Sequence, residues 1–546
     1  MDRWFRPLLL LGVLLNLSGL TTVLMEPDAA LYASVARRMA EHGDAVNLLS
    51  QGRGWLDKPH FPFWMTALAF HLFGVGTAVY KLPGLVFWAV GAVYTYLFAL
   101  RFYSRAVARL AVLLLLSAQH LVMSNNDVRA EPYLLGLVMG GLYHFTRAQA
   151  HRFSLHLVWG AAWAACAVMT KGLFVLIPIA GGLAFHWARR RDGSQFWHPR
   201  WWLALLLVGV FTAPELYCLH QQFDLHPEKE VFGQVGVSGL RFFFWDSQFG
   251  RFFNTGPIQG KGSPLFFLHT VLWAFLPWSL WFYAAVVGAL RRRASSERPG
   301  EDYTLGAALL TLLVFSLSRF QLPHYTNVLF PFFCVITAAW LDRLSEGQAR
   351  QAARVQGVVV AAMLLLLPVL LWTVTPEGLR GGTLGLGAAV ALTLPGWSRA
   401  DLPGAIGKSF GACVALNLVL NVLVYPRLLD YQAGDKAAAF LNGLPSRPTG
   451  LYGFNSFALD FYARAPIERW SLSDLQARTG PVYVVLEARA VPELMEVGLR
   501  VQPLRAFKDY RVTRLTGRFL NPATRDEATR EVLVALVSSA PLAGVR

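Results

Sequence analysis

The chain has little charge for its length. Of its 546 residues, 15% are charged and 55% are hydrophobic, and they include 38 Phe and 18 Trp. A soluble core could not bury so much apolar surface, which excludes a single soluble domain. The composition indicates an α-helical protein that crosses a membrane many times.

Cysteine is also scarce. The chain has four cysteines, all inside apolar segments and without the spacing of a disulfide framework or a metal site: Cys166, Cys218, Cys334 and Cys413. They are interpreted as small packing residues.

No internal repeat or long low-complexity stretch is visible, which weakens the case for the inverted repeats of many transporters.

About thirteen segments are predicted to span the membrane, because each has roughly 17 to 25 mostly apolar residues. Their approximate centres are residues 16, 90, 115, 140, 162, 180, 210, 275, 312, 333, 365, 388 and 415. The first segment has no small-residue cleavage site, so we expect an uncleaved signal anchor.

The net charge of +16 is explained by topology. Arginines concentrate in every second connection, at residues 101–109, 147–152, 189–191, 291–298, 343–354 and 399. The positive-inside rule places these connections and the N-terminus in the cytoplasm. The basic excess therefore does not indicate a nucleic-acid partner, and an odd number of spans leaves the C-terminus outside.

The composition changes near Tyr425 to that of a soluble segment. We predict a transmembrane domain over residues 1–426 and a small extracytoplasmic α/β domain over residues 427–546. The second domain is expected to hold one buried strand and three helices, at residues 481–486, 435–441, 472–477 and 525–537.

Two outer segments accompany the spans. Residues 26–80 are predicted to include interfacial helices over 28–41 and 64–73, lying along the outer membrane surface. A second outer loop, about residues 222–263, carries several charged side chains.

The outward ends of the spans collect ionisable side chains, which are expensive in a bilayer and are therefore candidates for function. They come from loop one, the turn 125–132, the end of span five, the second outer loop and the end of span nine: Asp28, Tyr32, Asp57, Lys58, His60, Arg129, Glu131, Lys171, Arg251, Arg319, His324 and Tyr325.

These residue types suit displacement of a lipid phosphate from a sugar. Asp28 and Tyr32 are four residues apart and share a helix face. A carboxylate there can accept the proton of an incoming hydroxyl or amine. Arginine offers a planar fork to phosphate oxygens and lysine a point charge, so the nearby cations can stabilise the departing phosphate.

Three motifs of the chain resemble the lipid-linked sugar glycosyltransferases of the GT-C fold, particularly the bacterial aminoarabinose transferases and their protein mannosyltransferase relatives. They are Asp28-Ala-Ala-Leu-Tyr-Ala, Asp57-Lys-Pro-His-Phe-Pro-Phe-Trp and Ser318-Arg-Phe-Gln-Leu-Pro-His-Tyr. The resemblance covers residues 1–340 well and the rest more loosely. It implies a GT-C membrane domain in a bacterial inner membrane, with its site on the periplasmic side.

The resemblance also implies roles for single residues. Asp28 matches the acid that acts in catalysis, Lys58 and Arg251 match cations that hold the carrier phosphate, and Tyr325 resembles an aromatic hydroxyl that contacts it. Arg129 and Glu131 resemble a second acidic motif. We therefore predict catalytic Asp28, Asp57 and Glu131; phosphate-binding Lys58, Arg129, Lys171, Arg251, Arg319, His324 and Tyr325; and acceptor-binding or orienting Tyr32 and His60.

Simpler explanations remain open for several of these residues. Asp28 could cap an interfacial helix, and Lys58 could extend to lipid headgroups. Arg129 and Glu131 could form an ion pair at a helix start. Lys171 could anchor a span at the interface.

The chain departs from the family pattern at two places. Asp57-Lys58-Pro59-His60 stands where the family usually has Glu-Lys-Pro-Pro, and Asp246 and Gln248 stand where histidines are expected before Arg251. No cofactor is predicted, and a divalent metal is left as an alternative that these departures disfavour.

The sequence thus predicts transfer of a sugar from a polyprenyl-phosphate carrier to an extracytoplasmic acceptor such as lipid A or another envelope glycolipid. No Asp-x-Asp motif is present, which favours a lipid-borne donor over a sugar nucleotide. One base and a direct displacement would invert the anomeric centre. The alternatives are a protein O-glycosyltransferase and, from a different class, a transporter or flippase of a lipid-linked or charged solute.

Overall fold

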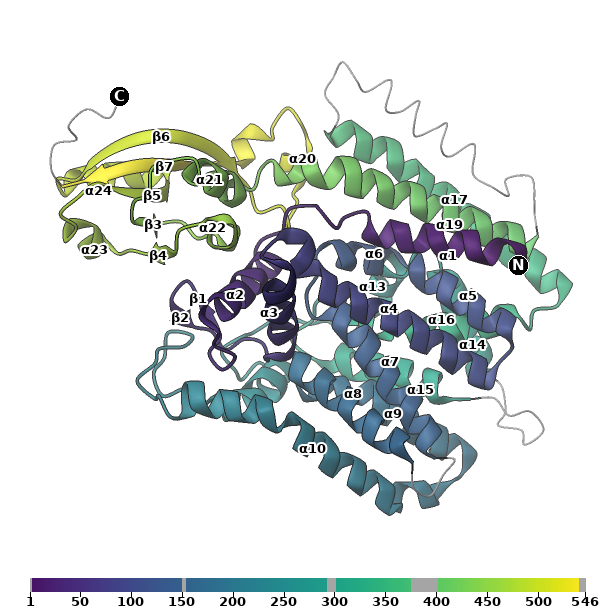
Figure 1. The fold of residues 1–546 in the computed structure, drawn as a ribbon. Coiled ribbons are helices and arrows are strands. Elements are labelled where there is room, and N and C mark those ends of the chain that lie inside the picture. The colour runs from purple at the N-terminus through teal and green to yellow at the C-terminus, as the bar shows by residue number, and fades with distance from the viewer. Residues whose placement is uncertain (1, 150–153, 292–300, 375–400, 540–546) are drawn as a thin grey trace.

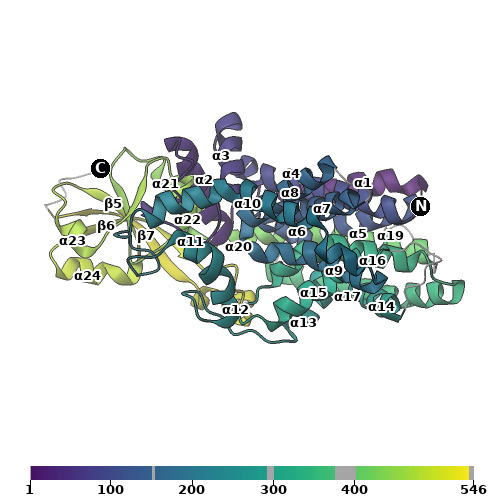
Figure 2. The ribbon, with the colours of Figure 1, turned by 90° about the horizontal axis from the view of Figure 1, so that it is seen from below.

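The computed structural model describes residues 2–149, 154–291, 301–374 and 401–539. A bundle of long helices forms most of the molecule, and a mixed β-sheet with short helices lies at one end of it (Figure 1). Figure 2 shows the same arrangement along another direction, with the N-terminus at the end of the bundle far from the sheet.

The bundle consists of helices that follow the apolar segments of the sequence. Their bounds are α1 Asp2–Leu17, α4 Thr77–Phe102, α5 Arg105–Leu116, α6 Gln119–Asn126, α7 Glu131–Ala148, α8 Leu155–Lys171, α9 Leu176–Arg190, α10 Pro199–Leu219, α13 Phe266–Ala274, α14 Ser279–Arg291, α15 Tyr303–Leu317, α16 Phe330–Leu341, α17 Glu346–Val374 and α19 Leu402–Val419.

Helices lie at or beside twelve of the thirteen predicted span centres, and the remaining centre, residue 388, is outside the described residues. Within the described residues, five helical segments are long and apolar enough to cross a membrane, or six if α5 and α6, bent by 54°, form one span. The protein is therefore a multi-pass membrane protein, as predicted, while the count of thirteen stays a prediction.

Helices α4 and α7 approach each other closely because both have glycine at the contact. A Cβ atom on Gly136 would overlap the carbonyl oxygen of Phe87, and one on Gly91 would overlap the side chain of Leu135. This contact matters for the candidate site, since α7 begins at Glu131.

Between α1 and α4 lie the two helices predicted for loop one, α2 (Asp28–His42) and α3 (Phe61–Phe73). They are joined through a short hairpin of β1 (Leu49–Ser50) and β2 (Arg53–Gly54). Most of α2 is buried in protein, whereas α3 exposes Leu68, Leu72 and Phe73. Their location at the membrane surface stays a prediction.

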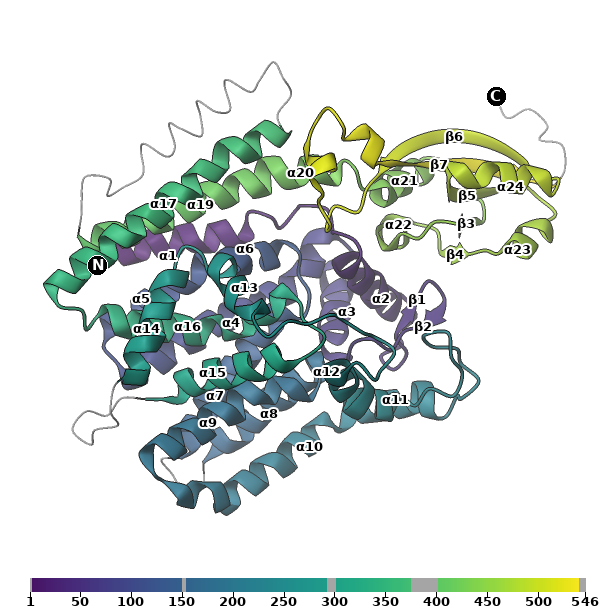
Figure 3. The ribbon, with the colours of Figure 1, turned by 180° about the vertical axis from the view of Figure 1, so that it is seen from behind.

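The second outer loop contains four short helical segments joined by turns and irregular chain. In chain order it contains the π-helical segment η3 (His220–Asp224), the short helix α11 (Gly239–Arg241), the π-helical segment η4 (Phe242–Gly250) and the short helix α12 (Arg251–Phe253). Seen from behind, α11 and α12 lie beside the end of the bundle near α3 (Figure 3).

The C-terminal sheet has the strand order β4-β3-β5-β7-β6. Strands β3 and β4, and β3 and β5, pair in parallel, whereas β7 pairs antiparallel with both β5 and β6. The bounds are α20 Tyr425–Leu429, α21 Ala433–Leu441, β3 Thr449–Tyr452, α22 Phe457–Tyr462, β4 Ile467–Arg469, α23 Leu472–Gln476, β5 Val482–Glu487, α24 Val491–Glu496, β6 Arg500–Asp509, α25 Gly517–Leu520 and β7 Arg530–Ser538.

The predicted strand 481–486 is confirmed as β5, and α21 and α23 match two of the predicted helices. The predicted helix 525–537 is wrong, because most of that segment is strand β7. Residues 532–537 are buried without a break between β5 and β6. A continuous apolar run of this length can be a helix or a central strand, and its β-branched valines favour the strand.

Candidate functional site

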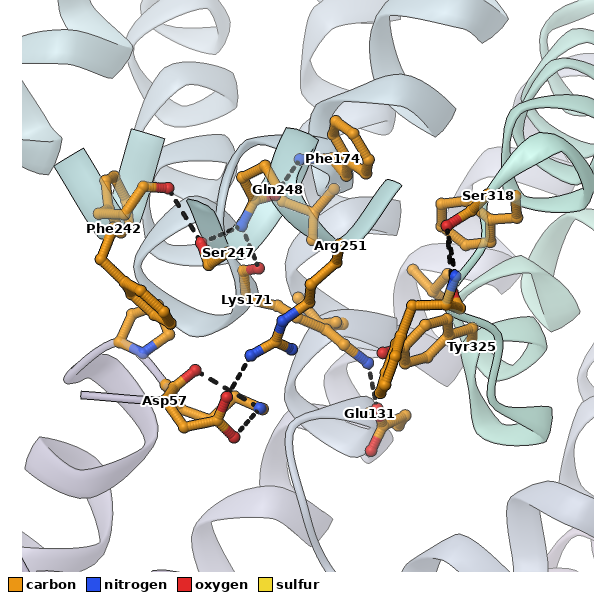
Figure 4. Close-up of a pocket in the computed structure, with 18 of the residues that line it drawn as sticks. Asp57, Glu131, Lys171, Phe174, Phe242, Ser247, Gln248, Arg251, Ser318 and Tyr325 are labelled. Carbon is orange, nitrogen blue, oxygen red and sulfur yellow. Dashed lines mark hydrogen bonds and ion pairs between the residues drawn. The ribbon is translucent and has the colours of Figure 1, made fainter. Parts of the chain in front are cut away.

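The main pocket lies where α7, α8, α10 and the two outer segments meet, and it encloses about 1060 Å³, part of it open to solvent. Its charged or titratable lining residues are Asp57, Lys58, Glu131, Lys171, Glu215, Arg251, His324 and Tyr325. Its apolar lining includes Leu134, Phe174, Val175, Phe242, Phe243 and Val328. The pocket therefore combines three cations and three acids with an apolar lining (Figure 4).

Asp57 is the centre of the first ion network. Lys58 Nζ lies 2.5 Å from Asp57 Oδ2, and Arg251 donates to Asp57 Oδ1 from the other side (Figure 4). Burial by itself raises the pKa of Asp57, but Lys58 and Arg251 more than offset this and lower it to about 2. Both cations thus face one ionised carboxylate that fixes their positions.

Burial lowers the pKa of the Lys58 ammonium, and Arg251 adds to that effect. Asp57 opposes it, and the same carboxylate raises the pKa of Arg251 against its own burial. A further anion in this pocket would therefore be favoured by two closely spaced cations that share a single acid.

Glu131 is the centre of the second network. It is the first residue of α7, and Lys171, the last residue of the neighbouring helix α8, donates to its Oε1. His324 Nε2 lies 3.7 Å from the same oxygen. Lys171 Nζ also lies 4.3 Å from the ring centroid of Tyr325, whose hydroxyl interacts with Arg251. Tyr325 thus links the two networks.

Arg129 joins two further acids. Its guanidinium lies 2.5 Å from Asp28 Oδ2 and 2.5 Å from Asp127 Oδ2. The Asp28 side chain is 41% exposed, in contrast to Glu131 at 3%. Asp28 is therefore the most accessible of the three acids predicted to be catalytic, since Asp57 is held between two cations.

A second cavity lies on the other side of Glu131 and His324. It has a volume of about 1110 Å³, part of it open to solvent, and Asp127 and Arg129 also line it. Part of its wall comes from the C-terminal part of the chain, with Tyr425 of α20 and with Val512, Thr513 and Leu515. The two cavities thus share a wall of ionisable side chains.

Of the predicted site residues, His60 and Arg319 lie apart from this cluster, whereas Tyr32 lies beside it: burial and the nearby carboxylates of Asp28 and Asp57 raise the pKa of its hydroxyl. His60 is fully buried, with Nδ1 3.0 Å from Glu215 Oε1 and Nε2 2.9 Å from the carbonyl oxygen of Val46. The ring of Tyr32 packs against Trp55 and Phe63. The side chain of Arg319 is exposed and does not line the main pocket, although its neighbours Ser318 and Phe320 do.

Some residues of the site were not predicted from the sequence. Glu215 is a fully buried acid inside α10, and its place in a predicted span is a signal that could have found it. Asp127 belongs to the turn 125–132 but was not predicted as a site residue. Gln248 accepts from the backbone N–H of Phe174 and donates to the carbonyl oxygen of Lys171, contacts that no sequence pattern indicates.

The site residues do not fit a divalent metal. Both oxygens of Asp57 are occupied by cations, Asp246 lies 3.6 Å from Arg241, and the Gln248 amide is bound to neighbouring protein atoms. Across the described ranges, no group of three His, Cys, Asp or Glu side chains could hold a metal ion. No step of the proposed reaction is therefore assigned to a metal.

Comparisons with known proteins agree with the motifs. The profile of the dolichyl-phosphate-mannose-protein mannosyltransferase family matches residues 57–218. A protein of Pseudomonas fluorescens named undecaprenyl phosphate-alpha-4-amino-4-deoxy-L-arabinose arabinosyl transferase 2 is 27% identical over 78% of this chain and 72% of its own. The correspondingly named protein of Edwardsiella ictaluri is 26% identical over 66% of this chain, and the match spans 64% of that relative's length.

The fold comparison covers the complete chain. The structure of ArnT from Cupriavidus metallidurans bound to undecaprenyl phosphate superimposes with a TM-score of 0.75, at 22% identity, over 100% of both chains. The predicted fold type is thus confirmed for the membrane part. The chain has the GT-C fold and resembles lipid-linked sugar glycosyltransferases of the aminoarabinose transferase type, as its motifs indicated.

Proposed function

We propose that the protein is a membrane glycosyltransferase that moves a sugar from a polyprenyl-phosphate carrier to an extracytoplasmic acceptor. The observation that carries this proposal is the convergence of Lys58, Lys171, Arg251 and Tyr325, from four separate segments, on one end of an apolar pocket. Cations suit the carrier phosphate, and the apolar interior suits its lipid chain.

The donor phosphate would lie between Lys58 and Arg251, with the Tyr325 hydroxyl as a further donor. Asp57 would orient the two cations rather than act as a base, since its low pKa leaves it a weak proton acceptor. Arg251 supplies a fork of N–H groups, so its replacement by lysine would keep the charge and lose the geometry.

Asp28 is the proposed general base. The acceptor hydroxyl attacks the anomeric carbon, its proton passes to the Asp28 carboxylate, and the bond from that carbon to the phosphate oxygen breaks. The leaving phosphate keeps the electron pair and is stabilised by the cations. Arg129 would hold Asp28 in place, and Glu131 would position Lys171.

The second cavity is the proposed acceptor side, because it is lined by Arg129, which holds Asp28, and shares Glu131 and His324 with the main pocket. The names of the relatives support undecaprenyl phosphate as the carrier and 4-amino-4-deoxy-L-arabinose as the first sugar to test. Lipid A or a related envelope glycolipid is the proposed acceptor. We further propose an inner-membrane location with the N-terminus in the cytoplasm and the site outside, in line with the arginine distribution.

The stereochemistry offers a separate test. A single displacement with one base inverts the anomeric centre, so donor and product should have opposite anomeric configurations by NMR. Retention of configuration would contradict the direct displacement.

The main experiment measures transfer of radiolabelled sugar from a panel of polyprenyl-phosphate sugars to extracted envelope lipids by the purified protein. Transfer should collapse in Asp28→Asn and Lys58→Ala, with both variants still folded in detergent. Unchanged transfer in both would contradict the site. Transfer to protein acceptors alone would favour an O-glycosyltransferase, and solute movement without any transfer in reconstituted vesicles would favour a transporter.

A further inference from the structure

Helix α22 of the C-terminal unit, defined here as residues 425–539, is held at both ends by loop one. Its N-terminus is bound by Glu26, whose Oε1 accepts from Ser456 Oγ at 2.5 Å and from the backbone N–H of Ala458 at 2.7 Å. Its C-terminus is bound by Arg37 of α2, which donates to the carbonyl oxygens of Phe461 and Ala463 at 2.8 and 2.6 Å.

The groups suit these positions. An acceptor at the N-terminus and a donor at the C-terminus satisfy the N–H and C=O groups that a helix leaves unpaired at its ends. Arg38 adds an ion pair in the middle, with its guanidinium 2.7 Å from Asp460, whose side chain is 3% exposed. Figure 1 shows α22 beside α2 at the junction of sheet and bundle.

The segment just before Asp28 is held as well. Gln432, between α20 and α21, accepts from the backbone N–H of Glu26 at 3.0 Å and donates to the carbonyl oxygen of Leu24 at 2.9 Å. The backbone N–H of Leu24 donates to the hydroxyl of Tyr462 at 3.0 Å. Burial raises the pKa of Glu26 to about 7, which is consistent with a carboxyl group enclosed by protein.

Asp28 lies within this clamp, two residues after Glu26 and nine before Arg37. From the opposite side, its carboxylate forms the ion pair with Arg129. We infer that Glu26 is a positioning residue and that the C-terminal unit, through its contacts with Glu26, Arg37 and Arg38, sets the place of Asp28 for catalysis.

The inference rests on the proposed function for its kinetic test, because the effect passes through Asp28. A displacement of about 1 Å in a reacting group can cost roughly 10²-fold in rate. Glu26→Ala removes the acceptor for two donors, whereas Glu26→Gln keeps an oxygen in the same place. Asp474→Ala is the matched control, since this acid caps α23 in the same unit and lies away from α2.

The experiment uses the full chain in detergent and has two readouts. For kinetics, we expect kcat to fall at least about tenfold in Glu26→Ala and in Arg38→Ala, with the donor KM within about twofold. Glu26→Gln should restore most of the activity, and Asp474→Ala should keep it. In an Asp28→Asn background, Glu26→Ala should cause no further loss, because the two changes act through one group.

The second readout is hydrogen–deuterium exchange of residues 20–36 and 452–464. Exchange of both segments should increase in Glu26→Ala and stay unchanged in Asp474→Ala. Unchanged exchange would overturn the clamp even if the wild type transfers no sugar, which separates its failure from that of the proposed function. Increased exchange with wild-type kcat would overturn the positioning role alone. If Glu26→Ala does not fold, both the kinetics and the hydrogen–deuterium exchange are measured on Arg38→Ala.

Discussion

At the scale of single residues, the main pocket differs from a simple row of cations because Lys58 and Arg251 share one carboxylate. Asp57 keeps both groups in place before an anion binds, which avoids the entropy cost of ordering two long side chains at that moment. The same pairing explains why a substitution at Asp57 should be as harmful as one at either cation.

Removal of a phosphate-binding cation should therefore affect donor use strongly. We expect kcat/KM for the polyprenyl-phosphate donor to fall about 10²- to 10³-fold in Arg251→Ala, and by a similar factor in Lys58→Ala. Arg251→Lys should recover only part of the loss. Steady-state transfer assays with varied donor measure this, and Lys261→Ala, an exposed cation of the same outer loop, is the control.

A loss no larger in Arg251→Ala than in Lys261→Ala would contradict phosphate binding at this end of the pocket. The variant Asp57→Asn tests the role of the shared carboxylate. If it keeps its activity while both cation variants are inactive, the phosphate itself holds the two cations in place.

Glu26 gives a pH-dependent contribution to stability. Burial raises its pKa from the ordinary value of 4.5 to about 7, and the nearby acids Asp509 and Asp435 act in the same direction against the bonds from Ser456 and Ala458. The folded protein therefore holds a proton that the unfolded chain releases. The stabilisation is fully present below about pH 4.5 and is lost as the pH rises through about 7.

We therefore expect the thermal midpoint of the wild type in detergent to fall relative to that of Glu26→Gln by a few degrees between pH 5 and pH 8. Differential scanning fluorimetry at several pH values measures the difference. Parallel curves for the two proteins over this range would show that Glu26 does not titrate there.

At the scale of elements, the position of Glu131 depends on how closely α7 packs on α4. Gly136→Ala would force the two helices apart, because the new methyl group meets a backbone carbonyl that cannot move alone. We expect a loss of about 1 to 3 kcal/mol in stability and a lower kcat, since Glu131 and its partner Lys171 move with the helix.

Gly209→Ala is the control for this prediction. That glycine lies within α10, and among the described residues no atom outside the helix lies within 4 Å of the position that a new methyl group would take. Alanine there should therefore be neutral or slightly stabilising by helix propensity. Thermal midpoints and transfer rates of both variants test the argument. Equal effects of the two substitutions would mean that close α4–α7 packing does not hold Glu131.

Helices and strands were predictable from the sequence where the apolar residues follow the spacing of one kind of secondary structure. The apolar spans were predicted from the length of their apolar segments, and α2 was predicted from the apolar face of its sequence. The helix predicted at residues 525–537 is wrong because residues 532–537 are apolar at every position, a pattern without a helical or strand period. Their valines and their pairing with β5 and β6 stabilise the strand. Strand β6 was missed, since as an edge strand it is mostly exposed and polar.

The candidate site was predictable in its residue types and less so in its pairings. The family resemblance indicated Asp28, Lys58, Arg251 and Tyr325. The sharing of the Asp57 carboxylate depends on contact between Asp57 and Arg251, which lie 194 residues apart in the chain. His60 stands where the family pattern has proline, and it binds the buried Glu215, a contact that no local pattern reveals.

At the scale of the whole molecule, the N-terminus and the sheet lie at opposite ends of the helix bundle (Figures 1 and 2). The main pocket and the second cavity lie near the sheet, because both are lined from the outer segments or from the C-terminal unit. With the bundle across the membrane, the C-terminal unit and the site share one side, and the start of α17 faces the other.

Cysteine labelling in intact cells tests this topology. Gln476→Cys, at the exposed end of α23, should react with a membrane-impermeant maleimide, and Gly347→Cys, at the exposed start of α17, should react only after permeabilisation. Three native cysteines are buried and Cys166 is half-buried, so the native cysteines themselves should react little with the maleimide. The reverse pattern would place the acids and cations of the pocket in the cytoplasm, away from an extracytoplasmic acceptor. Reaction of both positions in intact cells would contradict a membrane between them.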